Sequence, residues 1–134
     1  MLSVPSFLLR KLYVKGSLQN TPKGVSFRLR DSLGSGYAEE MSPLTLDGGA
    51  MPMEDTYFFV DSEPRSFDTV SRENPFCLLL NQDTVITIVN ASLSPEPDKV
   101  GMGFKVPGLG MLEFDFVDQP PVGDQTAEDQ TEAD

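Results

Sequence analysis

Apolar and polar residues alternate with a period of two along several stretches of this chain, and this pattern constrains the fold more than any other feature. Val25, Phe27 and Leu29 alternate with polar residues, and the segments 100–106 and 112–116 repeat the pattern with polar residues or glycine. Successive side chains of a β-strand point to opposite faces, so each segment predicts a strand with one apolar and one solvated face. Such strands are typical of antiparallel sheets that face water on one side.

Further strands are expected elsewhere in the chain. The segment 85–89 is rich in β-branched residues on both faces, which predicts a central strand. Residues 8–14 are predicted to form the first strand, and shorter strands are expected at 44–46, 57–60 and 76–80. Turn residues separate these segments at intervals of roughly 8–12 residues, which is typical of sandwiches and barrels. We therefore predict an all-β fold, an antiparallel β-sandwich of about seven to nine strands with an Ig-like or jelly-roll-like outline.

The apolar faces of these strands define a predicted core. Its members are Leu12, Val14, Val25, Phe27, Leu29, Leu46, Phe58, Leu78, Ile86, Ile88, Val100, Met102, Phe104, Leu112, Phe114 and Phe116. Cys77 lies within the longest apolar run, 76–80, and is predicted to be a small buried side chain.

The composition changes after Val117. Residues 118–134 contain six acidic residues, no basic residue and almost no apolar side chains. Such a segment cannot bury enough apolar surface to offset the entropy lost on ordering. We therefore predict two regions, a β-sandwich domain at 1–117 and a disordered acidic tail at 118–134.

Two gaps in the composition exclude whole classes of site. The chain has no His and only one Cys, Cys77. Catalysis through His, zinc sites that need imidazole or several thiolates, and an internal disulfide are therefore excluded. No glycine-rich phosphate motif precedes a helix, and no calcium-binding loop is present. We assign no catalytic, cofactor-binding or metal-ligating residue, and we expect no cofactor.

Carboxylates are the main catalytic groups that remain. Glu113 and Asp115 lie two residues apart on a predicted strand and so share one face. We interpret this face as solvated. The alternative is a carboxylate-based lyase or hydrolase, which needs two acids in one concave pocket with at least one of them desolvated.

The charge of the chain bears on its partners and location. The formal net charge is −11, which argues against nucleic-acid binding. No apolar run approaches the roughly 20 residues of a membrane span, and the N-terminus has no signal-peptide pattern. We therefore expect a cytoplasmic protein without a nucleic-acid or membrane partner.

The N-terminal region is basic, because residues 1–30 contain six basic residues and no acidic one. Arg and Tyr are enriched at protein interfaces. One interpretation is therefore a surface that binds a protein partner, and the other is an outer face balanced by acids from other strands. A homo-oligomer also stays open. The candidate interface residues are Phe7, Arg10, Lys11, Tyr13, Arg28 and Arg30.

Residues 5–18, with the sequence PSFLLRKLYVKGSL, resemble the opening of a group of short bacterial proteins. Some of these proteins are labelled hydroxymethylglutaryl-CoA reductase. That chemistry needs a nucleotide-binding fold and a catalytic His, so we do not expect this chain to perform it.

The layout of the chain is also similar to the small β subunit of bacterial C-glycoside deglycosidases. The shared points are the strand at 25–30, the Leu-Thr-Leu-Asp-Gly stretch at 44–48, the strand at 55–60 and a final hairpin entered through a Pro-rich turn. In that family the β subunit is a β-sandwich, and it packs on a metal-dependent TIM-barrel α subunit that carries the catalytic residues. The resemblance implies an accessory role and assigns no catalytic residue to this chain.

We therefore expect a non-catalytic accessory subunit that packs against a partner enzyme. The alternative binding role is a small-ligand or carbohydrate-binding module. That role requires an exposed aromatic platform, for which Tyr13, Tyr37 and Tyr57 are the candidates.

Overall fold

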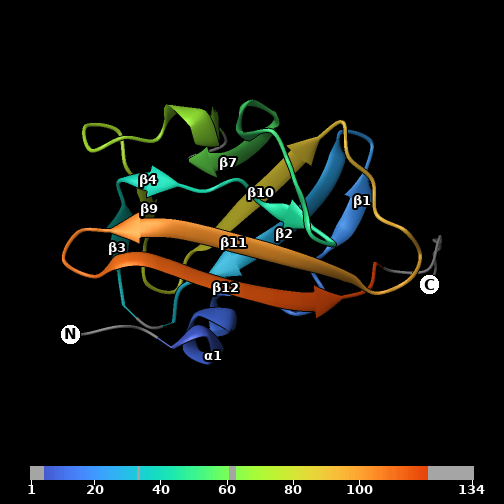
Figure 1. The fold of residues 1–134 in the computed structure, drawn as a ribbon, viewed down its shortest axis with the longest axis horizontal. Coiled ribbons are helices and arrows are strands. Elements are labelled where there is room, and N and C mark those ends of the chain that lie inside the picture. Colours follow the sequence, from blue (N-terminus) through green and yellow to red (C-terminus); the bar gives the residue numbers. More distant parts are fainter. Residues whose placement is uncertain (1–4, 33, 61–62, 121–134) are drawn as a thin grey trace.

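The computed structural model describes residues 5–32, 34–60 and 63–120 (Figure 1). Most of this part of the chain is β-structure, as the alternation predicts. In chain order the elements are α1 (Ser6–Leu9), η1 (Arg10–Leu12), β1 (Gln19–Thr21), β2 (Gly24–Arg30), β3 (Gly36–Ala38), β4 (Glu40–Met41), β5 (Thr45–Leu46), β6 (Gly49–Ala50), η2 (Met53–Asp55), β7 (Thr56–Val60), β8 (Glu63–Ser66), η3 (Phe67–Thr69), β9 (Phe76–Leu78), β10 (Asp83–Val89), β11 (Asp98–Val106) and β12 (Gly110–Asp118).

The strands form two larger sheets and a short ribbon. One sheet has the order β1-β2-β10-β7-β8, and the other has the order β12-β11-β5-β6 with β4 also paired to β11. Strands β3 and β9 form the two-stranded ribbon. All these strand pairs are antiparallel, which confirms the predicted fold class. The described residues form twelve strands, more than the seven to nine expected, because several are only two or three residues long.

The two larger sheets pack face to face, and Figure 1 shows β11 and β12 crossing in front of β2 and β10. Strand β10 lies between β2 and β7, which confirms the predicted central strand. Its residue Ile86 pairs with Phe27 on one side and Phe58 on the other, and all three side chains are buried. Of the predicted core residues, only Val14 and Leu46 stay partly exposed.

The strand predicted at residues 8–14 is wrong. Here the chain forms α1 and η1, and the amides of Leu8 and Leu9 donate to the carbonyl of Pro5 over 3.0 and 3.2 Å. The two buried side chains of this segment, Leu9 and Leu12, are three residues apart. This spacing places them on one side of a helical turn, whereas in a strand they would point to opposite faces.

Two smaller predictions also need correction. Cys77 is exposed, because Phe76 and Leu78 occupy the buried face of the three-residue strand β9 and the residue between them must point outward. Asp118, predicted as the first residue of the tail, is the last residue of β12. The remainder of the predicted tail, residues 121–134, lies outside the described residues.

Among the described residues, no helix is long and apolar enough to cross a membrane.

Candidate functional site

The structure divides the six candidate interface residues among different places. Phe7 lies on α1, and Arg10 and Lys11 lie on η1, where all three are exposed. Arg28 and Arg30 lie on β2, in the other part of the molecule's charged surface, and Tyr13 lies between the two groups. The sequence therefore identifies a short exposed segment correctly, but the structure does not join all six residues into one surface.

Arg28 and Arg30 are balanced by an acid from the neighbouring strand. Asp83 on β10 lies 3.4 Å from Arg28 Nη1 and 2.6 Å from Arg30 Nε. This arrangement matches the second interpretation of the basic region, an outer face neutralised by other strands. Exposed ion pairs of this kind contribute about 0–1 kcal/mol each.

Tyr13 ties the N-terminal segment to β12. Its ring stacks on Phe116 with a centroid distance of 3.7 Å. Its hydroxyl donates to Asp118 Oδ2 over 2.6 Å and accepts from the Leu18 amide over 3.0 Å. Burial, together with the neighbouring Asp118 carboxylate, raises the pKa of Tyr13 to about 12. Tyr13 is thus part of the scaffold rather than an exposed aromatic platform.

Asp118 is the other half of this link. Burial opposes its ionisation, but it accepts hydrogen bonds from the Tyr13 hydroxyl and from the amides of Gly16 and Gln119. These donors outweigh the burial and lower the pKa of Asp118 below its ordinary value. The end of β12 is therefore fixed to the segment that follows η1.

We expect Tyr13→Phe to lower the free energy of unfolding by about 1.5–3 kcal/mol, because it removes a hydrogen bond to a charged group and leaves the Leu18 amide without its acceptor. The wild type should also lose stability between pH 10 and about 12, since the folded state holds the tyrosine proton more tightly than the unfolded state does. This pH-dependent loss should shrink in the variant. Urea unfolding at pH 7 and across this pH range measures both effects.

Tyr37→Phe is the matched control, because the Tyr37 side chain is 48% exposed. It should change the stability by less than about 0.5 kcal/mol. Equal effects of the two substitutions would contradict the structural role of Tyr13.

A polar groove of about 500 Å³ lies on the outer face of β11 and β12, beside α1. Its lining combines hydroxyls, two cations, two carboxylates and two strand glycines. The polar lining residues are Ser6, Arg10, Ser42, Thr45, Lys99, Glu113 and Asp115. The glycines are Gly101 and Gly103; a Cβ at Gly103 would lie 3.2 Å from Glu113 Cγ and 3.3 Å from Ser42 Oγ. Both positions are therefore kept small by their own neighbours, and the groove floor is correspondingly low.

Asp115 organises the charges of this groove. Arg10 Nε donates to the Asp115 carbonyl over 2.6 Å, and Arg10 Nη2 lies 3.4 Å from its carboxylate. Lys99 Nζ approaches the other carboxylate oxygen to 3.6 Å. Glu113 and Asp115 thus lie on an outer face, as the sequence predicts.

Three large apolar side chains surround the groove. Met111 and Val117 alternate with Glu113 and Asp115 on the outward side of β12, and they are 45% and 62% exposed. Phe7 on α1 is 61% exposed, next to Ser6 of the groove lining. We call this surface the β12–α1 face.

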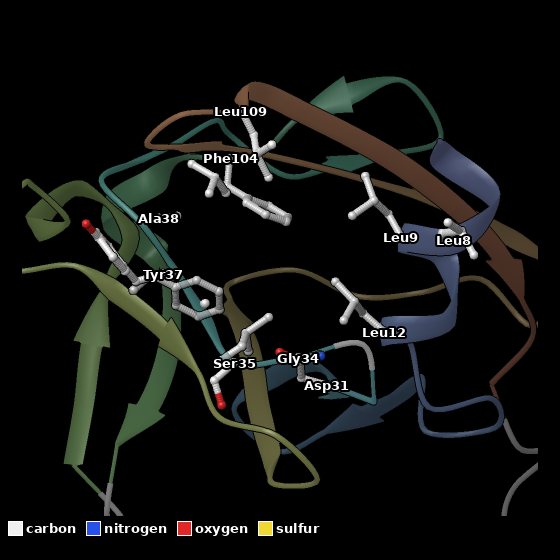
Figure 2. A pocket seen from close by; sticks show the side chains of 14 residues that line it. Leu8, Leu9, Leu12, Asp31, Gly34, Ser35, Tyr37, Ala38, Phe104 and Leu109 are labelled. Atoms are coloured by element: carbon white, nitrogen blue, oxygen red, sulfur yellow. The ribbon is translucent and has the colours of Figure 1, made fainter. Parts of the chain in front are cut away.

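A second cavity, of about 530 Å³, lies between the N-terminal helices, the β3–β9 ribbon and the β11–β12 turn. Figure 2 shows Leu9, Leu12, Phe104 and Leu109 pointing into it from three sides. Sequence reasoning missed this cavity, because its walls come from segments that are far apart in the chain.

One pair of carboxyl groups lies close together inside the fold. Burial and the adjacent Asp47 carboxyl raise the pKa of Asp98, which is 3% exposed. Asp98 also accepts from Ser94 Oγ, and Asp47 Oδ1 accepts from the Lys99 amide. The pair anchors the loop between β5 and β6 to the start of β11. In the described part of the chain, no three acidic or cysteine side chains gather closely enough to hold a metal ion.

A protein-family model matches residues 8–119, and its description is Hydroxymethylglutaryl-CoA reductase, N-terminal domain. The chain belongs to this family. The match to this reductase N-terminal domain extends from α1 to the end of β12 and so includes both cavities. It agrees with the reductase label of the proteins that residues 5–18 resemble. The likeness to the deglycosidase β subunit stays a prediction. No curated protein matches the chain.

Proposed function

We propose that this chain is a non-catalytic accessory subunit that packs against a partner enzyme through the β12–α1 face. The observation that carries the proposal is the set of exposed apolar side chains on this face, Phe7, Met111 and Val117. They surround a groove whose cations and carboxylates are balanced. Apolar anchors within a polar surround are the usual anatomy of a protein interface.

The family description supports the same role. It names an N-terminal domain of an enzyme, which is one part of a larger catalytic protein. This chain contains no His, and its described carboxylates do not form a desolvated acid pair in an open pocket. A domain with these properties acts together with catalytic residues that another polypeptide supplies.

The chemistry of the partner has two candidates. The resemblance to the deglycosidase β subunit favours a TIM-barrel enzyme that processes sugars. The family description favours an enzyme that reduces a CoA ester. Both candidates place the reaction in the partner and assign this chain a structural contribution.

The experiment is to purify the tagged chain from its native host and identify any stoichiometric partner by mass spectrometry and light scattering. The complex is then rebuilt from purified components with wild-type chain and with Phe7→Glu/Val117→Glu. Charges placed in an apolar contact should weaken binding at least tenfold, or by about 1.4 kcal/mol.

Leu80→Glu is the matched control, because Leu80 is also exposed but lies outside the β12–α1 face. It should leave the complex intact. A chain that purifies alone as a monomer would contradict the proposal. The β12–α1 face would be the wrong surface if Leu80→Glu weakened the complex as much as the double variant did.

A further inference from the structure

We infer that the apolar cavity beside α1 binds a small, neutral and predominantly apolar molecule. This inference concerns a different surface from the β12–α1 face and does not depend on the proposed partner. The cavity volume of about 530 Å³ lies within the roughly 300–1,000 Å³ of typical small-molecule sites. Such sites combine mostly apolar walls with a few polar groups that orient the ligand.

The walls of the cavity are buried side chains from every part of the fold. Leu9 and Leu12 come from the N-terminal helices, Ala38 and Phe76 come from the β3–β9 ribbon, and Phe104 comes from β11. Each of these side chains is at most 5% exposed. The ribbon, the N-terminal helices and the β11–β12 turn therefore enclose a space that the two main sheets leave unfilled.

The polar groups near the cavity are few, and most of them are engaged elsewhere. The Ser35 hydroxyl accepts from the Leu80 amide over 2.9 Å. Figure 2 shows the Tyr37 hydroxyl pointing away from the space between Leu9, Leu12 and Phe104. Asp31 is 4% exposed and accepts from the Gly34 amide over 3.0 Å.

These walls are poor hosts for water. A volume of this size corresponds to about 18 waters at roughly 30 Å³ each, and a buried water needs two to four polar partners. The lining offers few, so water in the cavity makes fewer hydrogen bonds than it makes in bulk. An apolar ligand that displaces this water gains the burial of its own surface as well.

The charge of the lining selects the ligand class. The cavity is lined by one ionisable acid, Asp31, and by no Lys or Arg among the described residues. A carboxylate in low-dielectric surroundings repels an anion and offers it no counter-ion. The site therefore fits an uncharged hydrocarbon or aromatic molecule better than a fatty acid or a phosphorylated compound.

The test uses the purified full chain and two related fluorescent probes, neutral N-phenyl-1-naphthylamine and anionic 8-anilino-1-naphthalenesulfonate. The neutral probe should bind saturably with one site per chain, and at least tenfold more tightly than the anionic probe. Leu109→Trp, which fills the cavity from the β11–β12 turn, should weaken binding of the neutral probe at least tenfold. Ala38→Leu tests the same prediction from the opposite wall and serves if the first variant folds poorly.

Val117→Trp is the matched control, since it adds the same side chain on the outer face of β12 and should leave probe binding unchanged. The inference is overturned if the neutral probe does not saturate, or if both cavity variants bind it like the wild type. Equal affinity for the two probes overturns the neutral ligand class. Loss of the partner complex or of a self-dimer in Leu109→Trp would show that a protein segment occupies the cavity instead.

Discussion

Phe27→Ala is expected to lower the free energy of unfolding by about 3–5 kcal/mol. Phe27 is fully buried on β2, where it pairs with Ile86 of the central strand. Its ring meets Phe116 of the opposite sheet edge-on, with a centroid distance of 5.4 Å, and lies 6.2 Å from the Tyr13 ring. The substitution therefore removes the contact that joins the two sheets and leaves a cavity between them.

Chemical denaturation at pH 7 measures this effect, and Phe7→Ala is the matched control. Phe7 is exposed, so its truncation should change the stability by less than about 0.5 kcal/mol. A loss below about 1.5 kcal/mol for Phe27→Ala would show that the sheets do not depend on this contact.

Gly24→Ala is the second substitution with a large expected effect, about 2–6 kcal/mol. Gly24 begins β2 with a φ of +150°, a conformation that L side chains rarely adopt. A Cβ at this position would also collide with the carbonyl oxygen of Ile88 on β10. Backbone strain contributes about 1–3 kcal/mol, and the collision contributes about as much again.

Gly108→Ala separates these two contributions. Gly108 has a φ of +85° in the β11–β12 turn, but a Cβ there meets nothing within 4 Å. It should cost about 1–3 kcal/mol from strain alone. If thermal or urea unfolding showed the two alanine variants to be equally stable, the close approach of β2 and β10 at Gly24 would be wrong.

The strands with strict alternation are predicted well from the sequence. Phe27, Phe104 and Phe116 each lie on a segment where the buried face repeats every second residue, and the structure buries all three. Alternation decides which face of a strand is apolar whatever the neighbouring strand is. The tight turn at 47–49 is similarly local, because Asp47 and Gly48 both adopt positive φ.

The N-terminal segment shows where such reasoning fails. Leu8, Leu9 and Leu12 are consistent with either a strand or a helical turn, since a short apolar run does not fix the period. The surroundings decide between them, because α1 and η1 fill the space beside β12 and the cavity. The same choice turns Tyr13 inward onto Phe116, where the sequence predicted an exposed side chain.

The candidate surfaces were predicted only in part. Phe7, Arg10 and Lys11 are exposed on consecutive turns, so a local sequence feature identifies them. The groove adds Lys99, Thr45 and the outward residues of β12, which meet through the pairing of β5, β11 and β12. Strand pairing between distant segments has no local signal in one sequence.

The sequence by itself determined the all-β class, the buried faces of the long strands and the absence of His chemistry, because periodicity and composition are properties of the chain alone. Only the tertiary structure decided which strands are neighbours, that Asp118 closes on Tyr13, and that the N-terminal helices and the β3–β9 ribbon enclose an apolar cavity. The physical reason is that these features depend on contacts between residues up to about a hundred positions apart, such as the 105 that separate Tyr13 from Asp118. Their free energies are set by packing in the folded state rather than by the preference of any single segment.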